Sequence, residues 1–539
     1  MPTLEHSQFR RGVNLRLAFL AAGLIVLAAS ISGQGLPVTN DLVRRSCGPC
    51  HQVDSQQRMS RISYVRKTPE GWEETIQRMA RLHGFSASPA DARKIEQYLS
   101  ASHGLVASEL EKIAYSLDGE DVQEQVPNDA VKNACVTCHS YAKIAGQRRT
   151  REEWLNLKDF LLALFPTLVY QHRFEDWPAL CDQALPWLAN QFPLETPEWK
   201  REKDLKAPGE GRWLLSGHQT GKGDYVGSLT FQAAADGEFE TRISRQFADG
   251  SETTMQGSGL WLGPAAWRGS GHGTDVDRER EVFHLSADGT ILRGRWYPYQ
   301  HPELGASETR YRVNAAPQIA GVFPSVLRRG AASVLRIHGA NFDSSLKPSD
   351  IALGDGIVVE KITEAASGQV AVQVRVAADA KVGRRDLRVG KASKAASLTI
   401  YDKIDYILVL PEKSMPRLGG VRAVKRFIQF EAHAFSNGPD RIPGNSDDLD
   451  LGMIKASWSI REPSTSSGAQ NAKYVGSIDQ AGLFTPAEEG PNAERFRSTN
   501  NAGDVWVNAS YKPDGSATAL NARAYVLVSV PDYRELITP

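Results

Sequence analysis

Four of the five cysteines of this chain lie in two copies of one short pattern, in which two cysteines three positions apart are followed directly by a histidine. The copies are Cys47-Gly48-Pro49-Cys50-His51 and Cys135-Val136-Thr137-Cys138-His139. Thiols at this spacing share one helical turn, so both can form thioethers with the vinyl groups of one porphyrin, and the adjacent imidazole then lies under the iron. The pattern predicts two covalently bound haem c groups. The predicted attachment and proximal residues are Cys47, Cys50, His51, Cys135, Cys138 and His139.

Two other kinds of site also contain a pair of cysteines at this spacing: a thioredoxin-like redox pair and half of a zinc site. Cysteine is rare in this chain, with five residues in 539. A chance copy of the full pentapeptide is therefore expected on the order of 0.001 times, and the chain has two. Zinc is disfavoured because each histidine adjoins a cysteine and is not spaced for tetrahedral closure.

The sixth ligand of the first iron is predicted from the segment after the first motif. Trp72, Ile76, Met79 and His83 recur at helical spacing and share one face. A thioether on a buried face fits a His/Met haem of raised potential, so Met79 is the predicted ligand. A core methionine is the structural alternative. Met59 and His83 are rival ligands, although the glycine after His83 indicates a helix end.

For the second iron the candidate is His172, since residues 140–200 contain no other histidine or methionine. A surface position beside Arg173 and Glu175 is an equally good interpretation of this residue. A five-coordinate iron, or a remote ligand such as His83 or His103, also stays open. The fifth cysteine, Cys181, lies in an apolar segment and is predicted to be a buried thiol.

Residues 1–33 have the pattern of an export signal. Arg10, Arg11 and Arg16 precede an apolar run from Leu17 to Ile31, and small residues around Gly33 offer a cleavage site. The run is about 15 residues long, shorter than the roughly 20 that a membrane span needs. We therefore expect a cleaved signal peptide, a periplasmic location and no membrane span after cleavage. With 63 basic and 63 acidic residues, the chain has no basic excess for nucleic acid.

A chain of 539 residues predicts several domains, and its 41% hydrophobic content is enough for packed cores. The first part is predicted to be mostly helical, including an apolar helix over residues 153–164. From about residue 205, short strands with alternating apolar and polar residues are separated by Gly and Asp-Gly turns. This predicts an α-helical dihaem cytochrome c domain followed by three all-β domains. The predicted domains are 34–200 (haem one about 35–115, haem two about 116–200), an antiparallel β-barrel at 205–314, an immunoglobulin-like domain of the IPT/TIG type at 316–402, and a C-terminal immunoglobulin-like domain at 404–539.

The predicted barrel is rich in tryptophan and histidine. We expect its tryptophans to anchor the core, whereas its histidines show no ligand spacing and are predicted to be structural or surface residues. The residues concerned are Trp213, Trp261, Trp267 and Trp296, and His218, His272, His284 and His301.

The predicted order of the chain is two haem motifs, then a barrel, then two immunoglobulin-like units. In this order the chain resembles the alpha subunit of quinohemoprotein amine dehydrogenase over nearly its whole mature length. Several stretches carry the resemblance, and Met79 matches the place of the methionine in the family pattern. They are Arg61–Ser63 with Lys67–Trp72, Gly294–Tyr297, and Tyr474–Gly476 with Gly482–Pro486.

The resemblance implies that the chain is the electron-transfer subunit of a periplasmic enzyme that oxidatively deaminates primary amines. Two smaller, different subunits would complete the enzyme. One of them would carry a cysteine tryptophylquinone, so no catalytic residue is expected in this chain. Electrons would pass from the quinone to the haems and on to an external acceptor, such as a small copper protein or a cytochrome.

One departure from the family pattern concerns the second haem. The family pattern has a histidine in the helix after Glu152-Glu153-Trp154, shortly before Phe165-Pro166, and this chain has none there. The departure leaves open a self-contained dihaem c-type enzyme such as a peroxidase. A haem-bearing binding or sensor protein, with the β domains as interaction modules, is the third alternative.

Overall fold

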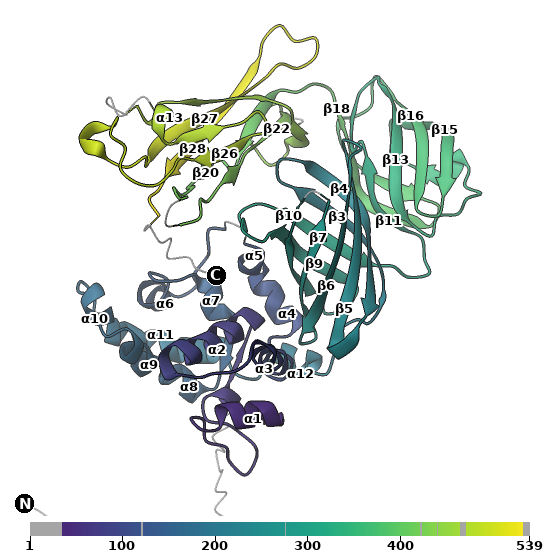
Figure 1. The fold of residues 1–539 in the computed structure, drawn as a ribbon. Coiled ribbons are helices and arrows are strands. Elements are labelled where there is room, and N and C mark those ends of the chain that lie inside the picture. Colours follow the sequence, from purple (N-terminus) through teal and green to yellow (C-terminus); the bar gives the residue numbers. More distant parts are fainter. Residues whose placement is uncertain are drawn as a thin grey trace, which may run out of the picture.

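The fold is described from a computed structural model of the chain, in which a helical part is followed by three β regions (Figure 1). The structure describes residues 35–119, 122–274, 276–420, 423–438, 440–463 and 470–531. The predicted order of a helical region, a closed antiparallel barrel and further β sandwiches is confirmed. The predicted signal peptide, 1–33, lies outside the described residues. Along the described ranges, none of the helices combines the length and the apolar character needed to cross a membrane.

The helical region consists of short helices and one small sheet. Most of the helices begin at a polar side chain that accepts a hydrogen bond from the first turn, such as Thr68 before α2. The helix expected over residues 153–164 is divided at Asn156 into α8 and α9. The helices are α1 (Asp41–Cys47), α2 (Pro69–His83), α3 (Pro89–Ser102), α4 (Ala107–Leu110), α5 (Ala114–Leu117), α6 (Asp129–Ala134), α7 (Tyr141–Ala145), α8 (Arg151–Leu155), α9 (Leu157–Leu164), α10 (Leu168–Gln171), α11 (Trp177–Gln191) and α12 (Pro197–Glu202), and the strands are β1 (Val65–Lys67) and β2 (Gln147–Arg149).

The second region is a closed barrel in which every neighbouring pair of strands is antiparallel, and β10 closes it against β3. The strands alternate between inward and outward residues, as the sequence pattern predicts. They are β3 (Gly211–Gln219), β4 (Gly223–Ala233), β5 (Glu238–Phe247), β6 (Glu252–Leu262), β7 (Ala266–Gly273), β8 (Glu279–Leu285), β9 (Ile291–Pro298) and β10 (Ala306–Arg312).

Tryptophans fill the barrel core as predicted. Trp213, Trp267 and Trp296 are buried, and Trp261 packs against the same core. Apolar side chains of the helical region, including Leu110 of α4, belong to this cluster as well. The helical region and the barrel therefore share one hydrophobic core.

The barrel interior also holds a buried network of charges. Arg310 pairs with Glu281 and Glu308, and Arg245 pairs with Glu279 and Glu308. All five side chains are at most 4% exposed. Removing Arg310 would take away the arginine that pairs with Glu281, and removing Arg245 would do the same for Glu279; loss of one partner of a buried ion pair is strongly destabilising.

Two β regions follow the barrel, and each buries its own apolar cluster between sheets. The last region packs against the barrel, where Phe427 donates its backbone N–H to Glu303 over 3.0 Å. The strands of the first are β11 (Gln318–Phe323), β12 (Val326–Arg328), β13 (Ala332–Ala340), β14 (Ile351–Ala352), β15 (Ile357–Ala366), β16 (Gln369–Val376), β17 (Gly383–Val389) and β18 (Ala392–Tyr401). Those of the last are β19 (Tyr406–Leu410), β20 (Lys413–Ser414), β21 (Ile428–Gln429), β22 (Glu431–Ser436), β23 (Leu449–Ile454), β24 (Ser457–Arg461), β25 (Gly476–Ile478), β26 (Leu483–Pro486), β27 (Gly503–Tyr511) and β28 (Leu520–Val528), with helix α13 (Asn471–Tyr474).

Candidate haem-attachment sites

The first motif continues the helix α1. Asn40 begins this helix by accepting a hydrogen bond from the backbone N–H of Val43 over 3.1 Å. Cys47 is its last residue, and its carbonyl accepts from the N–H groups of Cys50, over 3.2 Å, and His51, over 2.9 Å. The two thiols and the imidazole therefore leave one helical turn, as attachment to a single porphyrin requires.

The second motif is built in the same way. Asn128 begins α6 by accepting from the N–H of Val131 over 2.9 Å, and Cys138 donates its N–H to the carbonyl of Cys135 over 3.2 Å. Both segments read N-D-x-V-[KR]-x-x-C-x-x-C-H, and Val43 and Val131 are each fully buried. The chain thus contains one structural element twice, each time with the motif that predicts haem attachment.

Both histidines that are predicted to be proximal ligands are held in the orientation that iron ligation needs. Nδ1 of His51 donates to the carbonyl of Ser60 over 2.8 Å, and Nδ1 of His139 donates to the carbonyl of Ser140 over 3.1 Å. A carbonyl can only accept, so Nδ1 carries the proton and Nε2 keeps its lone pair. Burial lowers the pKa of His139, which favours the neutral ring. These residues fit a haem iron.

The cysteines of the two motifs differ in burial. Cys50 and Cys138 are exposed, and Cys47 and Cys135 are half-buried. Burial raises the pKa of Cys47 to about 11 and that of Cys135 to about 12. Cys181 is 2% exposed in an apolar cluster, so its prediction as a buried thiol agrees with the structure.

The helix α2 faces the first motif. Cys47 and Ile76 of α2 pack against the same apolar cluster, and Met79 lies one turn further along that helix, half-buried. A ligand needs room for the porphyrin beside its sulfur, and a half-buried methionine leaves such room. The position of Met79 is therefore compatible with the predicted role as sixth ligand.

The rival ligands of the first iron are placed less favourably. Met59 is fully buried among aliphatic side chains, and it adjoins Ser60, whose carbonyl binds the Nδ1 edge of His51. His83 is exposed at the end of α2, where Gly84 takes the left-handed conformation. His103, a remote candidate for the second iron, is fully buried, with Nδ1 2.8 Å from the hydroxyl of Ser102.

The structure places His172 directly at the second motif. Its Nε2 atom lies 3.5 Å from the hydroxyl of Thr137, between the two cysteines, and its ring packs against Trp177. The side chain is half-buried. A residue in this place can approach the second porphyrin, and its sixth-ligand role stays a prediction.

The chain contains a second duplicated segment, which the motif spacing alone did not predict. Residues 66–72 and 148–154 both read R-[KR]-T-x-E-x-W, and the strands that begin them, β1 and β2, pair antiparallel with Arg66 opposite Arg148. The indole N–H of Trp72 donates to the carbonyl of His103, and that of Trp154 donates to the carbonyl of Phe192, each over 2.9 Å. The two halves of the helical region are therefore two copies of one unit.

The repeat gives the second unit a counterpart of Met79. Met79 follows its tryptophan by seven residues, and the residue seven positions after Trp154 is Leu161. Leu161 lies on α9 and packs against the apolar cluster of the second unit. An aliphatic side chain cannot ligate iron, so the two units differ at this position.

One buried carboxylate joins the two units. Glu109 accepts two hydrogen bonds from Arg66, over 2.8 and 2.9 Å, one from Arg148 over 3.0 Å and one from Thr196 over 2.7 Å. Burial alone raises the pKa of Glu109, but the hydrogen bonds and charges of the two arginines outweigh it and lower the pKa to about 2. Although it is fully buried, Glu109 stays ionised at neutral pH, because the two arginines hold its pKa well below 7.

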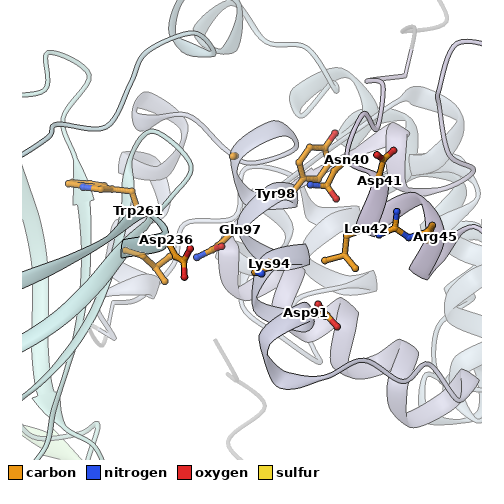
Figure 2. A pocket seen from close by; sticks show the side chains of 13 residues that line it. Asn40, Asp41, Leu42, Arg45, Asp91, Lys94, Gln97, Tyr98, Asp236 and Trp261 are labelled. Atoms are coloured by element: carbon orange, nitrogen blue, oxygen red, sulfur yellow. The ribbon is translucent and has the colours of Figure 1, made fainter. Parts of the chain in front are cut away.

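A polar cavity of about 850 Å³ lies beside the first motif, between the helices α1 and α3 and the barrel. Figure 2 shows Asp236 and Trp261 reaching it from the barrel side and Lys94, Gln97 and Tyr98 from α3. Its lining residues include no histidine or cysteine, so the cavity offers the iron no ligand.

The fold and the two motifs define a haem-binding protein with a helical domain and a set of β domains. Four family models match the chain: "Quinohemoprotein amine dehydrogenase A, alpha subunit, haem binding" over residues 38–199, and domains II, III and IV of the same alpha subunit over residues 206–312, 316–402 and 407–537. The chain belongs to the family of quinohemoprotein amine dehydrogenase alpha subunits.

Other comparisons add only weak likeness. No curated protein matches the sequence. A de novo designed fluorescence-activating β-barrel is 20% identical, with 19% of this chain and 92% of that chain covered and a TM-score of 0.16. The EC1-2 pair of human protocadherin-24 is 11% identical, with 41% and 100% covered and a TM-score of 0.17.

Proposed function

We propose that this chain is the dihaem electron-transfer subunit of a periplasmic quinohemoprotein amine dehydrogenase. It accepts electrons from a cysteine tryptophylquinone in a smaller partner subunit after oxidative deamination of a primary amine. It passes them to an external carrier such as a small copper protein or a cytochrome. The observation that carries this proposal is the duplicated attachment element, in which His51 and His139 both keep Nε2 available for iron.

Different residues of the chain would hold the two haem groups, orient their ligands and fix the two units relative to each other. A bound haem c supplies a one-electron couple whose potential depends on its axial ligands. The four motif thiols fix the porphyrins, and the carbonyls of Ser60 and Ser140 orient the proximal rings. Glu109 holds Arg66 and Arg148 together, which keeps the two units at a constant separation.

Burial of the fifth cysteine supports placing the quinone in a partner subunit. Cys181 and Trp177 lie one helical turn apart on α11, the spacing at which a cysteine and a tryptophan could be joined. They are only 2% and 1% exposed, and the indole N–H of Trp177 is bound to the carbonyl of Ala134. An amine substrate has no access to a cofactor at this place.

The test is purification of the native complex from its host, followed by mass spectrometry of the small chains and anaerobic addition of a primary amine. We expect a crosslinked cysteine–tryptophan peptide in a co-purifying chain and reduction of the haem spectrum by the amine. A complex that retains its small subunits but whose haems stay oxidised would contradict the proposal.

A self-contained dihaem enzyme such as a peroxidase is the second candidate, because Leu161 stands where Met79 stands in the first unit. Such an enzyme needs an iron with an open position. Peroxide turnover by the isolated haem-loaded chain, lost in a Leu161→Met variant, would favour this candidate. Turnover that requires the small subunits and an amine would exclude it.

A further inference from the structure

A cluster of metal-ligand side chains lies where the barrel meets the last β region. His218 comes from β3 of the barrel, and Glu431 and His433 come from β22. The Nε2 atom of His218 is 3.0 Å from each carboxylate oxygen of Glu431, and the Nε2 atom of His433 is 3.4 Å from one of them. One ligand atom from each of the three residues lies within 4.8 Å of the other two.

Each histidine is anchored on its other nitrogen by a second carboxylate. Nδ1 of His218 is bonded to Asp224 over 2.7 Å, and Nδ1 of His433 is bonded to Asp450 over 3.0 Å. A carboxylate on Nδ1 that turns Nε2 toward a shared centre is the outer-shell arrangement of metal-binding histidines. The two rings therefore converge on Glu431 from different regions of the fold.

The charge and burial of the cluster favour a cation. Three carboxylates face two imidazoles, and the side chains of Glu431 and His433 are only 8% and 12% exposed. The excess negative charge calls for cations at the centre, either protons or a metal ion.

The two nitrogen–oxygen distances agree with tetrahedral coordination. Ligands about 2.0–2.1 Å from zinc at tetrahedral angles lie roughly 3.3 Å apart, and the nitrogen–oxygen distances here are 3.0 and 3.4 Å. Two imidazoles and one carboxylate suit zinc, whereas calcium and magnesium prefer oxygen ligands. His218 and Asp224 also line a cavity of about 490 Å³.

We propose that His218, Glu431 and His433 bind one zinc ion, with Asp224 and Asp450 orienting the two histidines. The ion ties the barrel to the last β region, because its ligands come from both. The sequence pattern does not reveal this site, since Glu431 follows His218 by more than 200 positions. The prediction that His218 has a structural or surface role without metal is replaced by this proposal.

The test uses the haem-loaded complex, stripped with a chelator, and a zinc titration against a chromophoric chelator. We expect one zinc equivalent per chain, with affinity at least tenfold weaker in His433→Gln and in Glu431→Gln. Asp450→Asn should weaken binding about tenfold, as loss of an outer-shell partner does. His272→Gln, an exposed histidine of the same barrel, is the matched control and should bind zinc like the wild type.

A second measurement separates zinc binding from misfolding. Each variant must keep the wild-type haem spectrum, and zinc should raise the Tm of the wild type and of His272→Gln but not that of His433→Gln. No zinc bound above the chelator baseline would overturn the proposal and leave the cluster as protonated histidines paired with carboxylates. Equal zinc affinity in wild type and His433→Gln would overturn it too.

Discussion

Replacing Glu109 with glutamine removes the anion that Arg66 and Arg148 share. The side chain keeps its shape, but two guanidinium groups that are at most 3% exposed lose their counter-charge. Because each arginine comes from a different haem unit, the substitution weakens the joint between the two units. We therefore expect a loss of stability together with a looser arrangement of the two motifs.

Two lines of reasoning give similar magnitudes for this loss. Removing one partner of a buried ion pair costs about 3–5 kcal/mol. The pKa of Glu109 falls from 4.5 to about 2 on folding. At roughly 1.4 kcal/mol per pKa unit this corresponds to about 3 kcal/mol of stability from the ionised form.

The sign of the pH dependence follows from the lowered pKa. A carboxyl group with a depressed folded pKa stabilises the protein above its unfolded pKa of 4.5, and this contribution is lost as the pH falls toward 2. The difference in stability between wild type and Glu109→Gln should therefore be full at neutral pH. It should shrink steadily between pH 4.5 and pH 2 and be lost below pH 2, where Glu109 is protonated in both the folded and the unfolded state.

The assay is denaturant unfolding of the haem-loaded chain, followed by circular dichroism in the haem region at several pH values. Glu111→Gln is the matched control, because Glu111 lies two residues away and its side chain is 67% exposed. The control should change the free energy of unfolding by less than about 0.5 kcal/mol. A Glu109→Gln variant as stable as this control at pH 7 would refute the reasoning.

Three further substitutions test other parts of the structure. Met79→Leu should lower the reduction potential of one haem by an amount on the order of 0.1 V in a redox titration, without changing the number of haem groups. The control Met59→Leu should leave both potentials unchanged. Equal effects of the two substitutions would refute the assignment of Met79. His172→Gln should alter the absorption spectrum of one haem, and the exposed His83→Gln should not; an unchanged spectrum would make His172 a surface residue. Arg310→Met should lower the free energy of unfolding in urea by about 3–5 kcal/mol. Arg312 is exposed on the same strand, so Arg312→Met should leave the free energy of unfolding nearly unchanged. Similar stabilities of the two variants would contradict the account of the barrel charges.

Local patterns in the sequence predicted most of the fold. The barrel strands follow from alternation of period two and from Asp-Gly turns, as in the stretch Tyr225–Phe231, which lies inside β4. The division of the helix over residues 153–164 at Asn156 was not predicted, because a short break leaves the apolar period nearly unchanged. Local periodicity therefore locates elements better than it locates their interruptions.

The attachment residues could be predicted because attachment to one porphyrin requires two cysteines and a histidine at this spacing. The segment R-[KR]-T-x-E-x-W, which both units contain, could have revealed the internal repeat, and with it the pairing of Met79 with Leu161. No local pattern in the sequence predicted the contacts between distant segments. Glu109 joins Arg66 and Arg148, and His218 meets His433, only because the chain folds back across domains.

The most direct test of the central claim is the number of haem groups that the chain holds covalently. A pyridine haemochrome assay on the purified, acid-extracted chain should return two equivalents of haem c per polypeptide. A value of one or none would show that the duplicated element does not hold two porphyrins, and the account of the chain as a dihaem electron carrier would be wrong.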